Sequence, residues 1–465
     1  MFLVNTIIPQ KDINAKQIDS RVSIFCKTFL LGRLLRKCNI IKLKGASCLQ
    51  VFKFIFQLIF SGKNLYQLLQ TKGYEPPFEK DVVYDFLNSV SYNWRKFLLL
   101  LSSKIIKRKL YPLTSEKRIN VLIFDDSVYS RPRSKAVELL AKVRDHATGK
   151  YVKGLRLLTM GWSDGNSFIP VAFSLLSSRK EENRYNGIKA DIDKRTNGYK
   201  RRQEALGKAT EVMFDLLEGA TKYDIPVDYI LFDSWFAFPK IIGKVLEYEK
   251  QVVCRLKSLP NIRYRYKGRN LSLKQLYNTV KKKPGNEIIA SVIVGMEVDE
   301  IDSKFQARII FVSDDNKNGW IALLTTDTSL KDQEIIRIYG KRWDIEVFFK
   351  MSKSYLKLAK EFQGRSYDMM VAHTTIVFAR YILLALENRK FKDSKTFGNM
   401  FFELCDELDD IRFIESLYLV LDLLKQSLID CLKLSEQKID QLFNHFAEFL
   451  PRYLKEPLMI FNSES

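Results

Sequence analysis

The first quarter of the chain has apolar residues at the three- and four-residue spacing that is typical of helices, so residues 1–115 are predicted to be mostly helical. Within this region, residues 61–73 predict a short helix closed by a glycine. Residues 79–96 predict a second helix, after the break at Pro76 and Pro77.

Two helices separated by about a turn are typical of a helix-turn-helix, whose second helix enters a DNA major groove. On that interpretation Lys80, Tyr84 and Asn88 face DNA, while Val83 and the Phe86-Leu87 pair pack inward. An ordinary helical hairpin fits the same pattern equally well.

The hydrophobic period changes after residue 115. Short apolar runs that end in polar residues are typical of buried strands, and a Ser-Asp-Gly-Asn turn at 163–166 predicts a hairpin. Strands are expected at 120–127, 155–162, 168–176, 227–233 and 252–256, and helices at 201–223 and 238–250. Further strand-like pieces follow at 262–267, 288–294, 307–312 and 320–325. The chain from 116 to 385 is therefore predicted to be an α/β domain with a β-rich insertion at about 258–328.

One predicted helix, residues 338–353, carries a carboxylate in a row of cations. At about 100° per residue, Arg342, Glu346, Lys350 and Lys353 fall along one face, with Tyr339 one turn before Arg342. The opposite face is apolar and is expected to pack on a core through Ile345, Phe348 and Phe349. A solvated helix with a Glu-Lys pair is the simpler interpretation of this segment taken alone.

Charge points to a polyanionic partner. The 76 Lys and Arg residues against 54 Asp and Glu give a formal net charge of +22, which favours nucleic acid. The charge is uneven, because residues 401–450 hold eleven acids and four bases, a net of −7, which leaves +29 for the rest.

Residues 386–465 are predicted to form a helical C-terminal region. Apolar residues recur at helical spacing in 401–408, 414–424 and 432–450. Such stripes usually cover the protein's own core. The alternative is that this acidic region pairs two protomers, since it would be kept away from phosphates.

Several classes of protein are disfavoured. Six scattered cysteines without a CxxC pair and only three histidines argue against a zinc site and suit a reducing cytoplasm. The sequence has no GxxxxGK[ST] loop, so no nucleotide cofactor is expected. We also expect no signal peptide and no membrane span.

The spacing Tyr339, Arg342, Glu346, Lys353 matches the Y-R-E-K signature. The segment resembles the one that carries the last catalytic acid in bacterial cut-and-paste insertion-sequence transposases of the DDE type. That resemblance implies an RNase H-like catalytic core, in which the first and fourth strands lie side by side. It also implies a DNA endonuclease and strand transferase that acts on transposon inverted repeats and target DNA as a homodimer, in association with the bacterial nucleoid.

By the same resemblance, Asp126, Asp233 and Glu346 are the catalytic acids and bind two Mg²⁺ ions, for which Mn²⁺ can substitute. Asp125 competes with Asp126, but the family's first acid normally stands directly before Ser or Thr, here Ser127. Carboxylates are the ligands that Mg²⁺ prefers, which fits a chain poor in His. Taken singly, Asp126 and Asp233 are equally typical of strand-end turns or helix caps.

The resemblance assigns Tyr339, Arg342, Lys353 and, more loosely, Lys350 to the phosphates of the transposon end. Trp320 resembles an aromatic residue that stacks on DNA bases, although a Trp in a strand is more often part of a core. Two other functions share these features: a DNA-binding regulatory or domesticated relative without strand transfer, and a nuclease that only cleaves.

Overall fold

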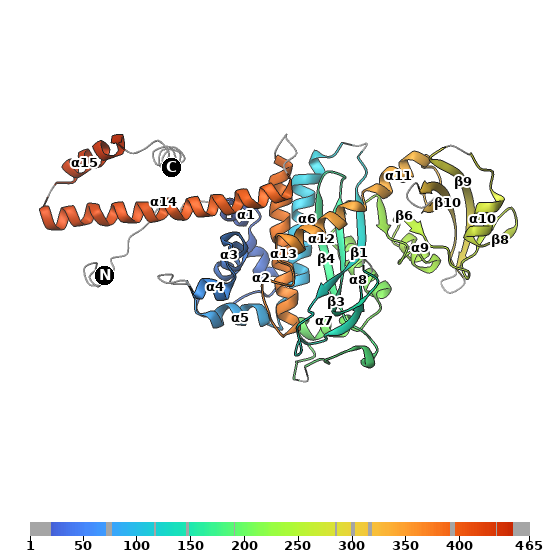
Figure 1. The fold of residues 1–465 in the computed structure, drawn as a ribbon, viewed down its shortest axis with the longest axis horizontal. Coiled ribbons are helices and arrows are strands. Elements are labelled where there is room, and N and C mark those ends of the chain that lie inside the picture. The colour runs from blue at the N-terminus through green and yellow to red at the C-terminus, as the bar shows by residue number, and fades with distance from the viewer. Residues whose placement is uncertain are drawn as a thin grey trace.

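The structure is a computed structural model of the whole chain, and it describes residues 20–70, 77–115, 118–145, 148–189, 191–283, 286–298, 303–314, 319–390, 396–433 and 435–449. Figure 1 shows a central sheet covered by helices, a β-rich lobe at one end and a long helix that projects from the other end.

The described residues up to 115 are helical, as predicted. Their helices are α1 (Arg21–Thr28), α2 (Leu31–Lys37), α3 (Cys48–Leu58), η1 (Ile59–Ser61), α4 (Leu65–Leu69), α5 (Lys80–Asn88), α6 (Trp94–Ile105), η2 (Ile106–Leu110) and η3 (Tyr111–Leu113). The predicted glycine stop at Gly73 lies outside the described residues. The single helix predicted over 79–96 is wrong: α5 ends at Asn88, and Asn93 caps a new helix by accepting from the Lys96 N–H at 3.0 Å.

The strands form one mixed sheet, as expected for an RNase H-like fold. They are β1 (Val121–Ser130), β2 (Ala141–Arg144), β3 (Tyr151–Ser163), β4 (Phe168–Leu176), β5 (Tyr229–Phe232), β6 (Gln251–Leu256), β7 (Tyr264–Tyr266), β8 (Arg269–Leu271), β9 (Ile288–Val298), β10 (Ser303–Asp314) and β11 (Gly319–Thr325). Their order is β2-β3-β1-β5-β6-β11-β10-β9-β7-β8, and β4 pairs with β3. The predicted hairpin is β3-β4, and the predicted neighbours β1 and β5 pair in parallel.

The β-rich insertion extends this sheet. Its last strand, β11, pairs antiparallel with β6, so the lobe at the right of Figure 1 is joined to the central strands by backbone hydrogen bonds. Consequently the end of β6 and the start of β11 lie beside the end of β5, where one of the predicted acids follows.

Helices cover the central strands. The helices between β4 and the C-terminal region are η4 (Glu181–Asn183), α7 (Asn197–Ala205), α8 (Ala209–Lys222), α9 (Pro239–Leu246), α10 (Leu273–Thr279), α11 (Asp332–Gly340), α12 (Trp343–Ser354) and α13 (Tyr367–Lys390), of which α10 lies in the β-rich lobe beside β7 and β8. Both α12 and α13 pack on β4, and α8 packs on β3 and β4. The single helix predicted at 201–223 is broken between α7 and α8 around Gly207, a residue with low helix propensity.

Helix α13 is the core of the molecule. Its length and composition would allow it to cross a membrane, but almost all of it is buried inside the protein. It contacts α5, α6 and β4, so the N-terminal helices and the sheet share one core. The predicted domain boundary at 385/386 falls inside this continuous helix, and the division of the chain into domains stays a prediction.

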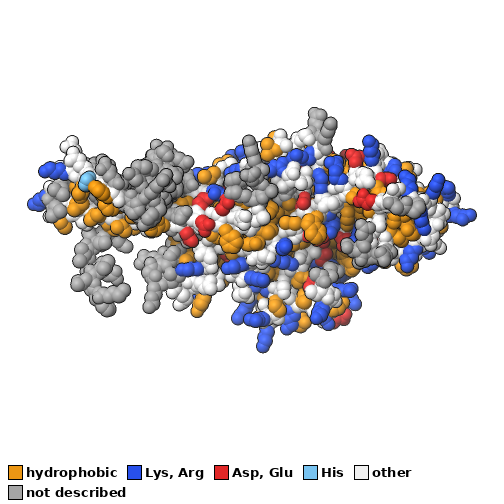
Figure 2. Space-filling model, turned by 45° about the horizontal axis from the view of Figure 1, so that its top comes forward, with side chains coloured by type: hydrophobic (Ala, Val, Ile, Leu, Met, Phe, Trp, Pro, Cys, Tyr) orange, Lys and Arg blue, Asp and Glu red, His pale blue; other side chains and the backbone are white. Residues whose placement is uncertain are grey.

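The C-terminal region contains α14 (Phe397–Leu432) and α15 (Glu436–Phe449), so the two predicted stripes at 401–408 and 414–424 belong to one helix. The first turns of α14 pack on the body: Leu404 is buried, and Phe401 lies 5.6 Å from Phe60 between ring centroids. Farther along, α14 projects from the body with Phe413, Leu419, Val420 and Leu424 exposed. Figure 2 shows Lys and Arg side chains spread over the body and apolar side chains along the projecting segment.

Candidate active site

Two of the candidate acids lie side by side where the parallel pairing of β1 and β5 ends. Phe124 of β1 is aligned with Phe232 of β5, so Asp125 and Asp233 follow at the same level of the sheet. Strand β5 ends there, whereas β1 continues to Ser130, so Asp125 lies within its strand and the predicted end of that strand at 127 is corrected. Each of these carboxylates accepts from the next backbone N–H, at 2.8 Å for Asp125 and 2.6 Å for Asp233, which holds both side chains in fixed orientations.

Asp125 and Asp126 have different partners, as expected for consecutive residues whose side chains alternate between the faces of a strand. Asp126 pairs with Arg156 of β3, with 3.1 Å between Nε and Oδ2. Asp125 pairs with Arg342, with 3.0 Å between Nη1 and Oδ2. In this structure it is thus Asp125, rather than the predicted ligand Asp126, that contacts the signature segment.

The signature lies on two helices, which corrects the single helix predicted over 338–353. Tyr339 belongs to the last turn of α11, and Arg342 immediately precedes α12. The break follows Gly340, and the Lys341 ammonium between the helices donates to the backbone carbonyls of Ile119 and Asp164. Burial of Ile345, Phe348 and Phe349 confirms the predicted core face of α12.

Arg342 joins acids from two elements. Besides Asp125, its guanidinium contacts Glu346 one turn along α12. Its carbon Cζ lies 5.8 Å from the centre of the Tyr339 ring, a cation–π distance. Arg342 therefore contacts two other residues of the signature, Tyr339 and Glu346, and also holds Asp125 of β1.

The surroundings of Asp125 are unfavourable for an ionised carboxylate. Burial raises the pKa of Asp125 to about 7, against the opposing effect of Arg342, and the neighbouring charges of Asp126 and Asp233 raise it further. Burial likewise raises the pKa of the Tyr339 hydroxyl. Asp125, Asp126 and Asp233 therefore lie close enough for their charges to repel one another, and Asp125 is shielded from water.

The other signature cations differ in their surroundings. Lys353 donates from Nζ to the Ser127 hydroxyl at 2.6 Å, directly after the acids of β1, and burial lowers the pKa of Lys353. Lys350 is exposed. The signature thus brings Arg342, Glu346 and Lys353 to the acid-bearing part of β1 and leaves Lys350 on the surface.

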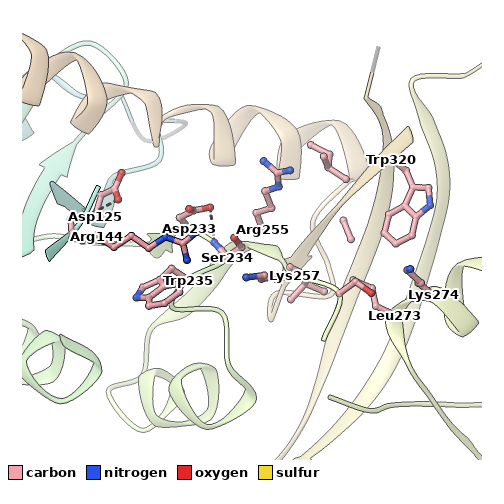
Figure 3. Close-up of a pocket in the computed structure, with 15 residues that line it drawn as sticks. Asp125, Arg144, Asp233, Ser234, Trp235, Arg255, Lys257, Leu273, Lys274 and Trp320 are labelled. Atoms are coloured by element: carbon pink, nitrogen blue, oxygen red, sulfur yellow. Dashed lines mark hydrogen bonds between the residues drawn. The ribbon is translucent and has the colours of Figure 1, made fainter. Parts of the chain in front are cut away.

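A cleft of about 660 Å³ opens beside the acids. Its lining includes Asp125, Asp126 and Asp233 at one end and Trp320 of β11 at the other, as Figure 3 shows for the labelled residues. Trp320 stacks on Tyr277 with 4.6 Å between ring centroids. This tryptophan is therefore both packed against an aromatic neighbour and part of the cleft wall.

The predicted DNA-facing residues of α5 lie away from this cleft. Lys80 is exposed and Tyr84 is half-buried. The Asn88 amide donates to the Tyr84 carbonyl at 2.7 Å, and its oxygen accepts from Ser366 at 2.5 Å. Val83, Phe86 and Leu87 are buried as predicted, and the contact of α5 with DNA stays a prediction.

Sequence reasoning missed several residues of the cleft wall. Arg144, Trp235 and Arg255 line it, and Arg156 holds Asp126. The place of Trp235 could have been predicted from the sequence, because it follows the candidate acid Asp233 by two residues. The places of the arginines could not, since they depend on how β2, β3 and β6 pair within the sheet.

The donor set suits a hard divalent cation. Aspartate and glutamate oxygens are preferred by Mg²⁺, and the raised pKa of Asp125 among like charges indicates a place where a cation would be favourable. Within the described residues, however, no three acidic, His or Cys side chains converge closely enough to enclose a metal. Arginines compensate the acids instead, through the Asp125–Arg342 and Asp126–Arg156 pairs.

Two models of known families match parts of the chain. Residues 58–261 match the family model of a DDE superfamily endonuclease, and residues 205–383 match that of a transposase DDE domain. The first range contains Asp126 and Asp233, and the second contains Asp233 and Glu346. No curated protein matches the chain.

These matches define the class: the chain carries a transposase-type DDE endonuclease domain, so it belongs among enzymes that cleave DNA. Its substrate is DNA, and enzymes of this class typically depend on a divalent metal.

Proposed function

We propose that the protein is a cut-and-paste transposase of the Y-R-E-K type from a bacterial insertion sequence. In this proposal it binds the inverted repeats of its element as a homodimer, cleaves the DNA at the ends and joins those ends to target DNA. The observation that carries the proposal is the contact of the signature with the acid-bearing part of β1, through Arg342 to Asp125 and through Lys353 to Ser127.

Asp126, Asp233 and Glu346 would hold two Mg²⁺ ions. When bound, such ions activate the attacking water or 3′ hydroxyl and stabilise the leaving oxygen. Closure of Glu346 onto the aspartates requires Arg342 to exchange its carboxylate partners for another anion. A DNA phosphate supplies that anion, because guanidinium groups bind phosphate in the same bidentate way as carboxylate.

The cations of the signature would bind different parts of the DNA. Lys353, held at Ser127, and Arg342, in contact with Tyr339, would bind the phosphates nearest the cut. Exposed Lys350 would contact a phosphate farther along the strand. Trp320, at the far end of the cleft, would meet bases of the same strand.

The test is a reconstituted reaction with labelled duplex that carries the repeats flanking the gene, a target plasmid and Mg²⁺. We expect strand cleavage at the element ends with free 3′ hydroxyls, followed by joined products, and neither with a shuffled repeat. Cleavage without joining would identify a nuclease. Repeat binding with no cleavage would identify a regulatory relative, and both results would contradict the proposal.

A further inference from the structure

Trp235 stands at the acidic end of the cleft, two residues after Asp233. Its side chain lies beside Asp233, Ser234 and Arg144 in Figure 3, and all four residues line the cleft. Trp235 remains 42% exposed, whereas the next two residues of the same loop, Phe236 and Ala237, are buried. The loop is thus anchored by its neighbours and presents an indole ring to the cleft.

Arg156 fixes the ring relative to the acids. The guanidinium carbon of Arg156 lies 5.7 Å from the centre of the Trp235 ring, within cation–π range, and Nε of the same residue is 3.1 Å from Asp126. Trp235 is therefore coupled through one side chain to a candidate catalytic acid. A flat aromatic surface held at a fixed position beside the candidate acids is a platform on which a planar group can stack.

The walls around this platform attract an anionic strand. The cleft is lined by four cations, which come from β2, the end of β6, the segment after it and α10: Arg144, Arg255, Lys257 and Lys274. An aromatic surface interleaved with cations is the combination that binds single-stranded nucleic acid, in which bases stack and phosphates follow the positive charge. A base inside an intact duplex is covered on both faces and cannot stack on a protein side chain.

We propose that Trp235 is a DNA-binding residue that stacks on an unpaired nucleobase next to the phosphate being cut. The inference rests on the proposed function, since it takes the acids beside Trp235 as the place of cleavage. It adds a base-binding position at the acidic end of the cleft, opposite the end that contains Trp320. Cleavage would then favour DNA that is opened at the cut.

The test compares Trp235→Ala with Trp235→Phe, which keeps an aromatic ring, and with Phe238→Ala as a matched control. Phe238 belongs to the same loop and is 41% exposed, but it does not line the cleft. Affinity is measured without divalent metal for a fully paired repeat duplex and for the same duplex with two unpaired nucleotides at the cut. One unpaired base is 2-aminopurine, whose fluorescence is quenched on stacking.

We expect Trp235→Ala to lose about tenfold or more in affinity for the opened duplex, the size of one lost base stack. It should also lose the quenching and bind the paired duplex almost as wild type does. Trp235→Phe should retain most of both signals, and Phe238→Ala should resemble wild type. Equal losses on both duplexes, unchanged quenching in Trp235→Ala, or the same losses in Phe238→Ala would overturn the inference.

A different result of the same experiment would refute the proposed function. If wild-type protein bound neither duplex better than a shuffled sequence, recognition of the repeats would be refuted. If wild type binds the repeats and Trp235 makes no difference, only the stacking role of Trp235 is refuted.

Discussion

The guanidinium of Arg342 donates to the carboxylate of Asp125 across 3.0 Å, which links the start of α12 to the middle of β1. Both side chains are largely shielded from water, with 16% and 18% exposed, and Arg342 contacts Glu346 as well. A divalent cation at these carboxylates must therefore compete with a positive charge that already lies between them. DNA phosphates that withdraw the arginine would favour metal binding.

Removal of the Arg342 charge should strengthen metal binding in the DNA-free protein. We expect Arg342→Gln to raise the affinity of the DNA-free protein for Mn²⁺ on the order of tenfold, about 1.4 kcal/mol. Titration followed by electron paramagnetic resonance measures it. Arg337→Gln is the control, because Arg337 is 60% exposed on α11 and pairs only loosely with Glu334, at 4.0 Å. Equal Mn²⁺ affinity in Arg342→Gln and wild type would show that Arg342 does not compete.

DNA recognition by α5 is tested separately from chemistry. Lys80→Ala together with Tyr84→Ala should weaken binding to the inverted repeat by about 1–3 kcal/mol and binding to random duplex by less, because base contacts specify and phosphate contacts only position. Fluorescence anisotropy over a salt series measures both. Lys222→Ala, an exposed cation on α8, is the control. Equal losses on the two duplexes would count against the helix-turn-helix.

Asn88 is expected to behave differently from Lys80. Its side chain bonds Ser366 just before α13, so Asn88→Ala should lower the free energy of unfolding by about 1 kcal/mol in addition to any effect on DNA.

The projecting part of α14 provides a test of dimerisation. Truncation after Ile411 keeps the buried first turns of α14 and removes the exposed apolar residues beyond them. We expect the truncated protein to bind one labelled end normally and to form no complex with two ends, as measured by native mass spectrometry. Paired ends in the truncated protein would exclude α14 as the dimer contact.

The core of the molecule contains a buried ion pair that should make the free energy of unfolding depend strongly on pH in the acid range. Arg380 of α13 contacts Glu361 at 2.6 Å, and both are buried. Arg380 and His373 hold the pKa of Glu361 at about 2, against the effect of burial, which raises it. Because the folded pKa is below the ordinary carboxyl value, the stabilisation is present at neutral pH and is lost as the pH falls toward 2.

Glu361→Gln should therefore lower the free energy of unfolding at pH 7 by about 3–5 kcal/mol, since it leaves Arg380 buried and uncompensated. Urea denaturation measures this value. Glu181→Gln, which breaks the exposed pair with Arg184, should cost less than about 1 kcal/mol. A similar small change for both variants would contradict the role given to the buried pair.

Local pattern was sufficient to predict much of the sheet. The apolar run before Asp125 and Asp126 and the run before Asp233 predicted β1 and β5, and the resemblance predicted their parallel pairing. Periodicity failed at helix ends. The breaks after Asn88 and Gly340 depend on an asparagine cap and on a glycine whose neighbour Lys341 bonds distant carbonyls. Such tertiary contacts are invisible in hydrophobic spacing.

The sequence predicted the kind of site, but not which residues contact one another within it. The signature spacing led to Arg342, Glu346 and Lys353, which the structure brings to the acid-bearing part of β1. Which of two adjacent aspartates faces α12 depends on the register of β1, and a shift of one residue reverses it. Partners such as Arg156 come from strands paired far along the chain, so no local pattern could identify them.

The most direct test of the account is a cleavage assay with single alanine substitutions of the acids. We expect Asp126→Ala, Asp233→Ala and Glu346→Ala each to lower Mg²⁺-dependent cleavage by about a thousandfold or more, because each removes a metal ligand, while repeat binding survives. Asp125→Ala should cost at most about tenfold, equivalent to about 1.4 kcal/mol, because in the proposed reaction Arg342 leaves Asp125 for a DNA phosphate. Substantial cleavage by the Asp233 or Glu346 variant, or activity that depends on Asp125 and not on Asp126, would contradict this assignment of the acids.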